Sequence, residues 1–151
     1  MHEIQVSEKK TLKLTNAVAR KVKPEEMRNL PLILTQLQNY IKSNNAQPIG
    51  PLVQHMEVDP SAPQQVNIYF IQQATQMITR LDPDYHVDPV LRVKGCLYAH
   101  YVGPMARNDL ATQKLNIYAF EHDIETAPSI YTIFVSQGDD DAVVDVFMET
   151  K

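Results

Sequence analysis

The sequence repeats itself at an offset of about 80 residues. Three pairs of matching positions carry the repeat: Pro24 with Pro104, Pro48 with Pro128, and the segment 37–40 with the segment 115–118. Two halves are therefore predicted, about 1–81 and 82–151, and the stretch 82–89, rich in aspartate and proline, is the expected linker between them. Because about 75 residues are too few to bury both faces of a sheet, we expect the halves to share the core of one domain, 1–151.

Each half has the same predicted order of elements, which is strand, helix, strand and strand. Apolar residues three and four positions apart predict a helix from Pro31 to about Ser43, and a second helix after Pro104. Alternating apolar residues predict one hairpin over 52–73 and another over 130–148. The expected fold class is α+β, with an antiparallel sheet, two main helices and a ligand crevice between the halves.

Composition narrows the class of protein. With 44% apolar and 21% charged residues, the chain is not expected to be disordered. The single cysteine excludes an internal disulfide and, without a signal peptide or a membrane-spanning run, favours a cytoplasmic protein that does not contact membranes. Basic residues gather over 9–28, but the net charge is −4 and helix-turn-helix and zinc-finger patterns are missing. We therefore expect no direct binding of nucleic acid.

The residues that could carry catalysis form no known motif. The sequence lacks a G-x-S-x-G elbow, a phosphate-binding glycine loop and an H-E-x-x-H zinc motif. Cys96 and His100 are four residues apart on one predicted strand, which is too far for a catalytic pair, so Cys96 is interpreted as a buried structural residue. The five histidines lack metal-ligand spacing. We predict no catalytic residue, metal or cofactor, which favours a binding protein over an enzyme.

Aromatic and soft side chains on the predicted strands indicate a ligand site. Alternation places Thr132 and Phe134 on one strand face, and it places Tyr98 and His100 on a face of another strand. The predicted ligand-binding set comprises Met56, Tyr98, His100, Thr132, Phe134 and Phe147. Such side chains suit flat apolar or cationic ligands, which they hold by stacking and by cation–π attraction. Core packing explains the same residues equally well, so both interpretations stay open at this point.

Three segments resemble those of one known family. They are Leu37-x-x-Tyr40-Ile41-Lys42 followed by Pro48-x-Gly50-Pro51, the strand 98–102 that ends in Gly103-Pro104, and the closing strand 129–134. These segments are similar to the signatures of the gyrase-inhibitor-like (GyrI-like) small-molecule-binding family. That family includes the effector-binding domains of AraC-type and multidrug-sensing MerR-type regulators. The resemblance covers nearly the whole chain.

The resemblance implies a duplicated strand–helix–strand–strand fold with a ligand pocket between the repeats. Members fused to helix-turn-helix domains sense amphipathic, often cationic drugs, whereas stand-alone members include inhibitors of DNA gyrase, and some related proteins are hydrolases. The late strand of the family often carries a pocket glutamate, where this chain has Thr132, and Met105 stands where an aromatic residue is usual. A threonine hydroxyl forms hydrogen bonds but cannot neutralise a cation or act as a base, so cation preference and hydrolysis both stay open.

The sequence and the resemblance together predict a stand-alone cytoplasmic domain that binds small molecules. Its expected role is to sense or sequester amphipathic or hydrophobic compounds, in connection with transcription regulation. The alternative is a protein-interaction module, such as an inhibitor of DNA gyrase, whose partner would be a topoisomerase or a regulator. A hydrolase of the same family is the third hypothesis.

Overall fold

The structure, a computed structural model, contains two compact units. It describes residues 4–59, 61–79, 82–136, 138 and 140–151. Unit 1 comprises Met1–Leu12 and Val93–Lys151, and unit 2 comprises Lys13–Arg92. Two long strands, β1 (Gln5–Val22) and β4 (Tyr85–Gly103), contribute residues to both units. None of the helices in the described ranges is both long and apolar enough to cross a lipid bilayer.

The units differ in their bounds from the two predicted halves. Residues 4–12 group with the second half of the sequence, so the boundary between the units falls within the continuous strand β1. The stretch 82–89 is predicted to be a linker, but β4 begins at Tyr85, so most of this stretch is part of a strand. Tyr85 and Val87 pack against the apolar core of unit 2, and this burial explains why the segment is a strand despite its prolines. That the units share one core, with a crevice between the halves, stays a prediction.

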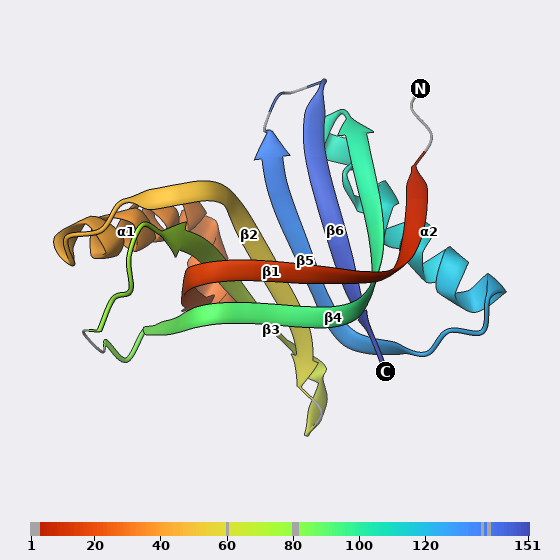
Figure 1. Ribbon diagram of the computed structural model, residues 1–151, viewed down its shortest axis with the longest axis horizontal. Helices are drawn as coiled ribbons and strands as arrows, with labels where there is room; N and C mark the ends of the chain where they lie inside the picture. The colour runs from red at the N-terminus through yellow and green to blue at the C-terminus, as the bar shows by residue number, and fades with distance from the viewer. Residues whose placement is uncertain (1–3, 60, 80–81, 137, 139) are drawn as a thin grey trace. The chain divides into compact units, whose positions relative to one another are not determined.

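Unit 2 packs one helix on an antiparallel sheet. Strand β3 (Ala62–Ala74) lies between β1 and β2 (Pro48–Asp59). A 3-10 helix, η1 (Pro24–Asn29), leads into α1 (Leu30–Ser43), drawn in orange tones in Figure 1. Helix α1 buries its apolar stripe against core residues of β1 and β3; the stripe is Ile33, Leu37 and Ile41. The predicted helix and hairpin are confirmed, and α1 ends before Asn45, which takes a left-handed φ of 63°.

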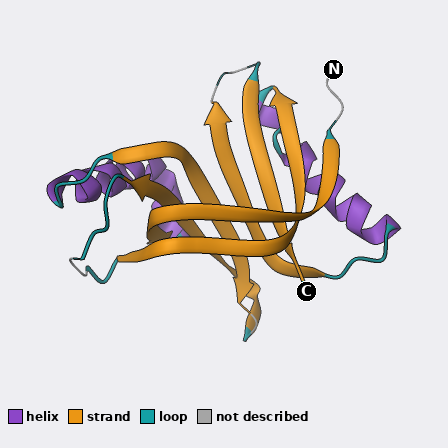
Figure 2. Ribbon diagram, in the orientation of Figure 1, coloured by secondary structure: helices purple, strands orange, loops and turns teal. Residues whose placement is uncertain are grey.

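Unit 1 has the same order of elements. The 3-10 helix η2 (Met105–Arg107) precedes α2 (Asp109–Glu121), and the hairpin of β5 (Thr126–Ser136) and β6 (Ala142–Thr150) follows. Strand β6 pairs with β4 on one side and with β5 on the other. Antiparallel strands and two α-helices make up most of the described chain, as Figure 2 shows, so the predicted α+β class is confirmed.

Candidate functional site

The sheet of unit 1 has one face that packs on α2 and one that points away from it. Leu97 and Ala99 of β4 join Val146 of β6 in the core under α2. Because side chains alternate along a strand, the neighbouring residues of β4 and β6 lie on the other face, which we call the site face. The register pairs Tyr98 with Phe147 and His100 with Asp145 across these adjacent strands.

Four residues of the site face form one group, the Asp145 cluster, which comprises Tyr98, His100, Asp145 and Phe147. The Tyr98 hydroxyl donates a hydrogen bond of 2.7 Å to Oδ1 of Asp145. Nδ1 of His100 lies 2.6 Å from the same oxygen. The rings of Tyr98 and Phe147 are in contact, with centroids 5.0 Å apart. Directly opposed residues of antiparallel strands approach closely, so the register itself assembles the cluster.

In the hydrogen bond between Tyr98 and Asp145, the phenol is the donor and the carboxylate is the acceptor. Burial raises the pKa of Tyr98 above the ordinary value for tyrosine, and the hydrogen bond to Asp145 and its charge raise it further. The phenol therefore stays protonated and donates at neutral pH. Both bonds reach Oδ1, and no residue in the described ranges donates to Oδ2. Since the Asp145 side chain is 22% exposed, its second oxygen can accept a bond from, or attract, a bound molecule.

The six residues predicted from the sequence do not share one face. Tyr98, His100 and Phe147 lie together on the site face, but Phe134 packs against the core under α2. Thr132 pairs with Val146 of that core and so points the same way as Phe134. The reason is the register of β5, which directs residues 131 and 133, rather than 132 and 134, to the site face.

Met56 belongs to the other unit. It lies on β2 opposite Ile68, and its side chain is exposed. The structure thus brings three of the six residues together, and a role of any of the six in ligand binding stays a prediction.

Sequence reasoning missed Asp145. The residue lies two positions before Phe147, so alternation alone puts both on one face of β6. It is also the one charged residue among the six that begin this strand, Ala142–Phe147. A lone carboxylate in a strand of valines needs a partner or a function. That signal was present in the sequence.

Cys96 takes no part in the cluster. Its side chain is fully buried, as predicted, and its thiol lies 3.6 Å from the carbonyl oxygen of Val93. Burial and the negative charge of Glu149 raise the pKa of the thiol, so the reactive thiolate is disfavoured. Among the described residues, no group of three or more His, Cys, Asp or Glu side chains could hold a metal ion.

Unit 2 has a charged cluster of a different kind. Arg20 of β1 makes an ion pair of 3.2 Å with Glu26 of η1 and donates a 2.9 Å bond to the carbonyl of Lys21. Its guanidinium lies 5.7 Å from the centre of the Tyr85 ring, which stacks on Tyr40. Arg20 lies two residues from each of the core residues Val18 and Val22. Because side chains alternate along a strand, its side chain shares their face, which packs on α1.

Comparison with known proteins identifies the fold. The sequence matches no protein-family model and no curated protein. A hydrolase from Listeria innocua is 9% identical, with a TM-score of 0.58 over 99% of this chain and 92% of its own. SAV2435 bound to tetraphenylphosphonium is 12% identical, with a TM-score of 0.56 over 99% of this chain and 94% of that one.

A third similar structure is EcmrR in a complex with DNA, which is 11% identical and has a TM-score of 0.69. The match covers 98% of this chain but 57% of the EcmrR chain. At such low identities these similarities establish a shared fold. That fold is consistent with the effector-binding fold that the resemblance implies.

Proposed function

We propose that this chain binds a small amphipathic molecule on the site face of unit 1, with the Asp145 cluster as its polar anchor. The single observation that carries the proposal is the partly buried carboxylate of Asp145, held by Tyr98 and His100 beside the ring of Phe147. A carboxylate next to aromatic rings favours a lipophilic cation, because the charge and the ring faces both attract it. The cellular role would be to sense or sequester such compounds.

Two further points support a cationic ligand. The resemblance left the site without a carboxylate, since Thr132 stands in the position of the family glutamate. Asp145 on the adjacent strand β6 supplies a negative charge on the site face instead, which is the opposite face from Thr132. Among proteins of similar fold, SAV2435 was solved with tetraphenylphosphonium, which is an aromatic cation.

Calorimetric titration with two ions of matched shape tests the proposal. Tetraphenylphosphonium and tetraphenylborate have similar size and apolar surface but opposite charge. We expect the wild-type chain to bind the cation at least tenfold more tightly, about 1.4 kcal/mol, and Asp145→Asn to remove this preference. Asp141→Asn, an exposed acid before the same strand, is the matched control that should keep it. Equal affinity for both ions, or an unchanged preference in Asp145→Asn, would contradict the proposal.

Hydrolysis is a second candidate function, favoured by one feature of the same cluster. A carboxylate oxygen only accepts hydrogen bonds, so Nδ1–H of His100 is the donor to Asp145 in the neutral ring, and Nε2 of this half-exposed ring is then free to act as a general base. The similar fold of a hydrolase from Listeria innocua agrees with this candidate. A panel of reactive aryl esters tests it: turnover that His100→Gln abolishes would support hydrolysis, and equal turnover in both proteins would exclude His100 as the base.

A further inference from the structure

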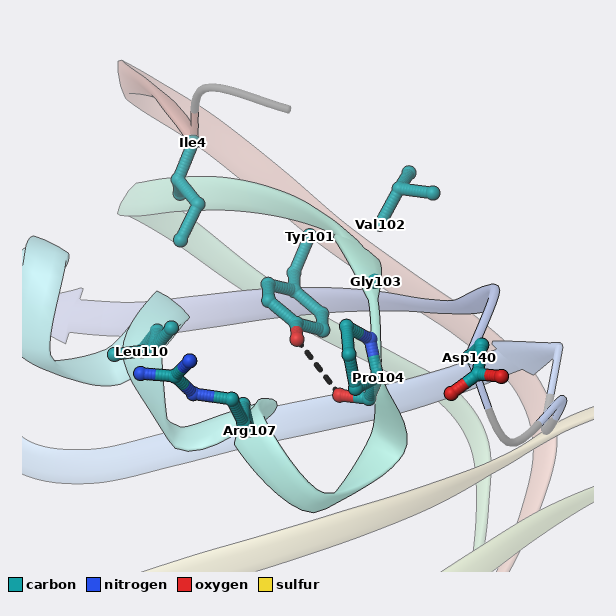
Figure 3. Close-up of a pocket in the computed structure, with 8 residues that line it drawn as sticks. All are labelled: Ile4, Tyr101, Val102, Gly103, Pro104, Arg107, Leu110 and Asp140. Carbon is teal, nitrogen blue, oxygen red and sulfur yellow. Dashed lines mark hydrogen bonds between the residues drawn. The ribbon is translucent and has the colours of Figure 1, made fainter. Parts of the chain in front are cut away.

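Unit 1 contains a cavity on a different part of its surface from the Asp145 cluster. The cavity has a volume of about 380 Å³ and lies where β4 turns through Gly103 and Pro104 into η2. Its walls are mostly apolar, with Ile4, Leu110 and the ring of Tyr101 around it (Figure 3). Tyr101 belongs to the core under α2, and no residue of the Asp145 cluster lines the cavity. Its volume falls within the range of small-molecule sites.

The turn that shapes the cavity is fixed by its own contacts. The hydroxyl of Tyr101 donates a 2.7 Å hydrogen bond to the carbonyl oxygen of Pro104, drawn as a dashed line in Figure 3. Gly103 has a φ of 157°, and a Cβ atom there would lie 2.9 Å from the Tyr101 hydroxyl. The turn therefore requires glycine, and the Tyr101 ring is held as a wall. A preformed wall lowers the cost of binding because little has to be ordered.

Charge in the cavity is placed at two separate points. Arg107 of η2 lines it, and the guanidinium forms no hydrogen bond or ion pair with any residue that the structure describes. Asp140 also lines it, on the other side of Pro104 from the guanidinium (Figure 3). A guanidinium binds a carboxylate through two parallel hydrogen bonds, whereas the Asp140 carboxylate repels an anion. An anionic ligand would thus bind in one orientation.

We propose that this cavity is a second binding site, which takes a small organic carboxylate with an apolar body. The apolar body fills the space between Ile4, Leu110 and Tyr101, and the carboxylate pairs with Arg107. This site prefers the opposite charge to the one proposed for the Asp145 cluster, and it uses none of the same residues. The two proposals can therefore fail separately.

Titration with 1-naphthylacetate and its neutral amide, 1-naphthylacetamide, tests the second site. We expect the wild-type chain to bind the acid at least tenfold more tightly than the amide, and Arg107→Gln to make the two affinities equal. Arg107→Lys keeps the charge but not the paired donors and should retain part of the preference. Arg28→Gln changes an arginine at the corresponding place in the last turn of η1 and should have no effect.

Three outcomes would overturn this proposal. They are no binding of either compound at millimolar concentration, equal affinity for acid and amide in the wild-type chain, and an unchanged preference in Arg107→Gln. Asp145→Asn serves as the internal reference, because it should weaken tetraphenylphosphonium binding and leave naphthylacetate binding unchanged. Arg107 is exposed, so its replacement should not prevent folding.

Discussion

The charged cluster of unit 2 and the charged cluster of unit 1 lie on different faces of their sheets. Arg20 points toward α1, where its side chain is 11% exposed and its partner Glu26 comes from the adjoining 3-10 helix. Asp145 points away from α2 and is 22% exposed, and its neighbour His100 is 48% exposed. In each cluster, a charged side chain is bonded to a neighbouring side chain and lies beside a tyrosine ring. Only the surroundings differ.

That difference separates a structural charge from one that is available to a ligand. A charge under a helix must find its partners within the protein, and Arg20 uses Glu26, the carbonyl of Lys21 and the ring of Tyr85. Even so, its Nε atom is buried without a partner in the described part of the chain. Asp145 uses one oxygen for its internal bonds and keeps the other. The face on which a charge lies is therefore a guide to its role.

The largest expected effect concerns Cys96, the single cysteine, which reports the opening of unit 1. Because the thiol is fully buried and its pKa is raised, we expect a disulfide reagent to label the native chain at least ~1,000-fold more slowly than the urea-unfolded chain. The rate of release of the chromophoric thiolate measures this. Cys96→Ser gives the background, and complete labelling of the native chain within seconds would show that unit 1 is open.

The next effect concerns the ion pair of unit 2. Glu26→Ala leaves the mostly buried guanidinium of Arg20 without its carboxylate, and we expect the free energy of unfolding in urea to fall by about 1–3 kcal/mol. Glu25→Ala removes an exposed acid from the same turn and should change it little. If Asp145→Asn costs as much as Glu26→Ala, the contrast between the clusters is wrong.

The pH dependence of the Glu26 effect has a defined sign. The backbone N–H of Lys23, and then Arg20, lower the pKa of Glu26 below its ordinary value of 4.5. A lowered pKa in the folded chain means that the stabilisation is complete above pH 4.5 and is lost as the pH falls below that value.

The labelling rate of Cys96 in Glu26→Ala also tests the prediction that the two units form one domain. The rate rises with the loss of stability if the units unfold together, and stays constant if they do not.

The smallest effect concerns Tyr98. Tyr98→Phe removes one hydrogen bond to Asp145, and we expect a loss of about 1 kcal/mol at neutral pH. The pKa of Tyr98 is raised in the folded chain, so its contribution is complete below pH 10 and shrinks as the pH rises beyond that value. Urea unfolding of both proteins between pH 7 and 11 measures the difference. A difference that grows above pH 10 would contradict the assigned donor.

Local patterns predicted the elements but not the way in which they face one another. The stripe of Ile33, Leu37 and Ile41 is visible in the sequence, and so is the burial of Cys96. Strand β5, however, is apolar on both of its faces, so alternation could not tell which face packs on α2. This is why Thr132 and Phe134 were grouped with residues that the structure places elsewhere.

The Asp145 cluster depends on contacts between distant segments. Asp145 and His100 are 45 residues apart, and only the pairing of β4 with β6 makes them neighbours. A strand's own pattern fixes which residues share its face but leaves the partner strand and the register undetermined. The aromatic members of the site could thus be proposed from the sequence, whereas the carboxylate that gives the site its charge emerged from the pairing.

The division of β1 between the units has a consequence for synthesis on the ribosome. Unit 2 is continuous in sequence, so all of its residues are synthesised before the part of unit 1 that begins at Val93. The first residues of β1 can form their contacts within unit 1 only after the segment that begins at Val93 has been synthesised. Glu8, for example, accepts a 2.6 Å hydrogen bond from the hydroxyl of Tyr118, a residue that lies 110 positions later in the sequence. During that interval, the nascent chain carries an unpaired strand end, and unit 2 is the segment that can fold first.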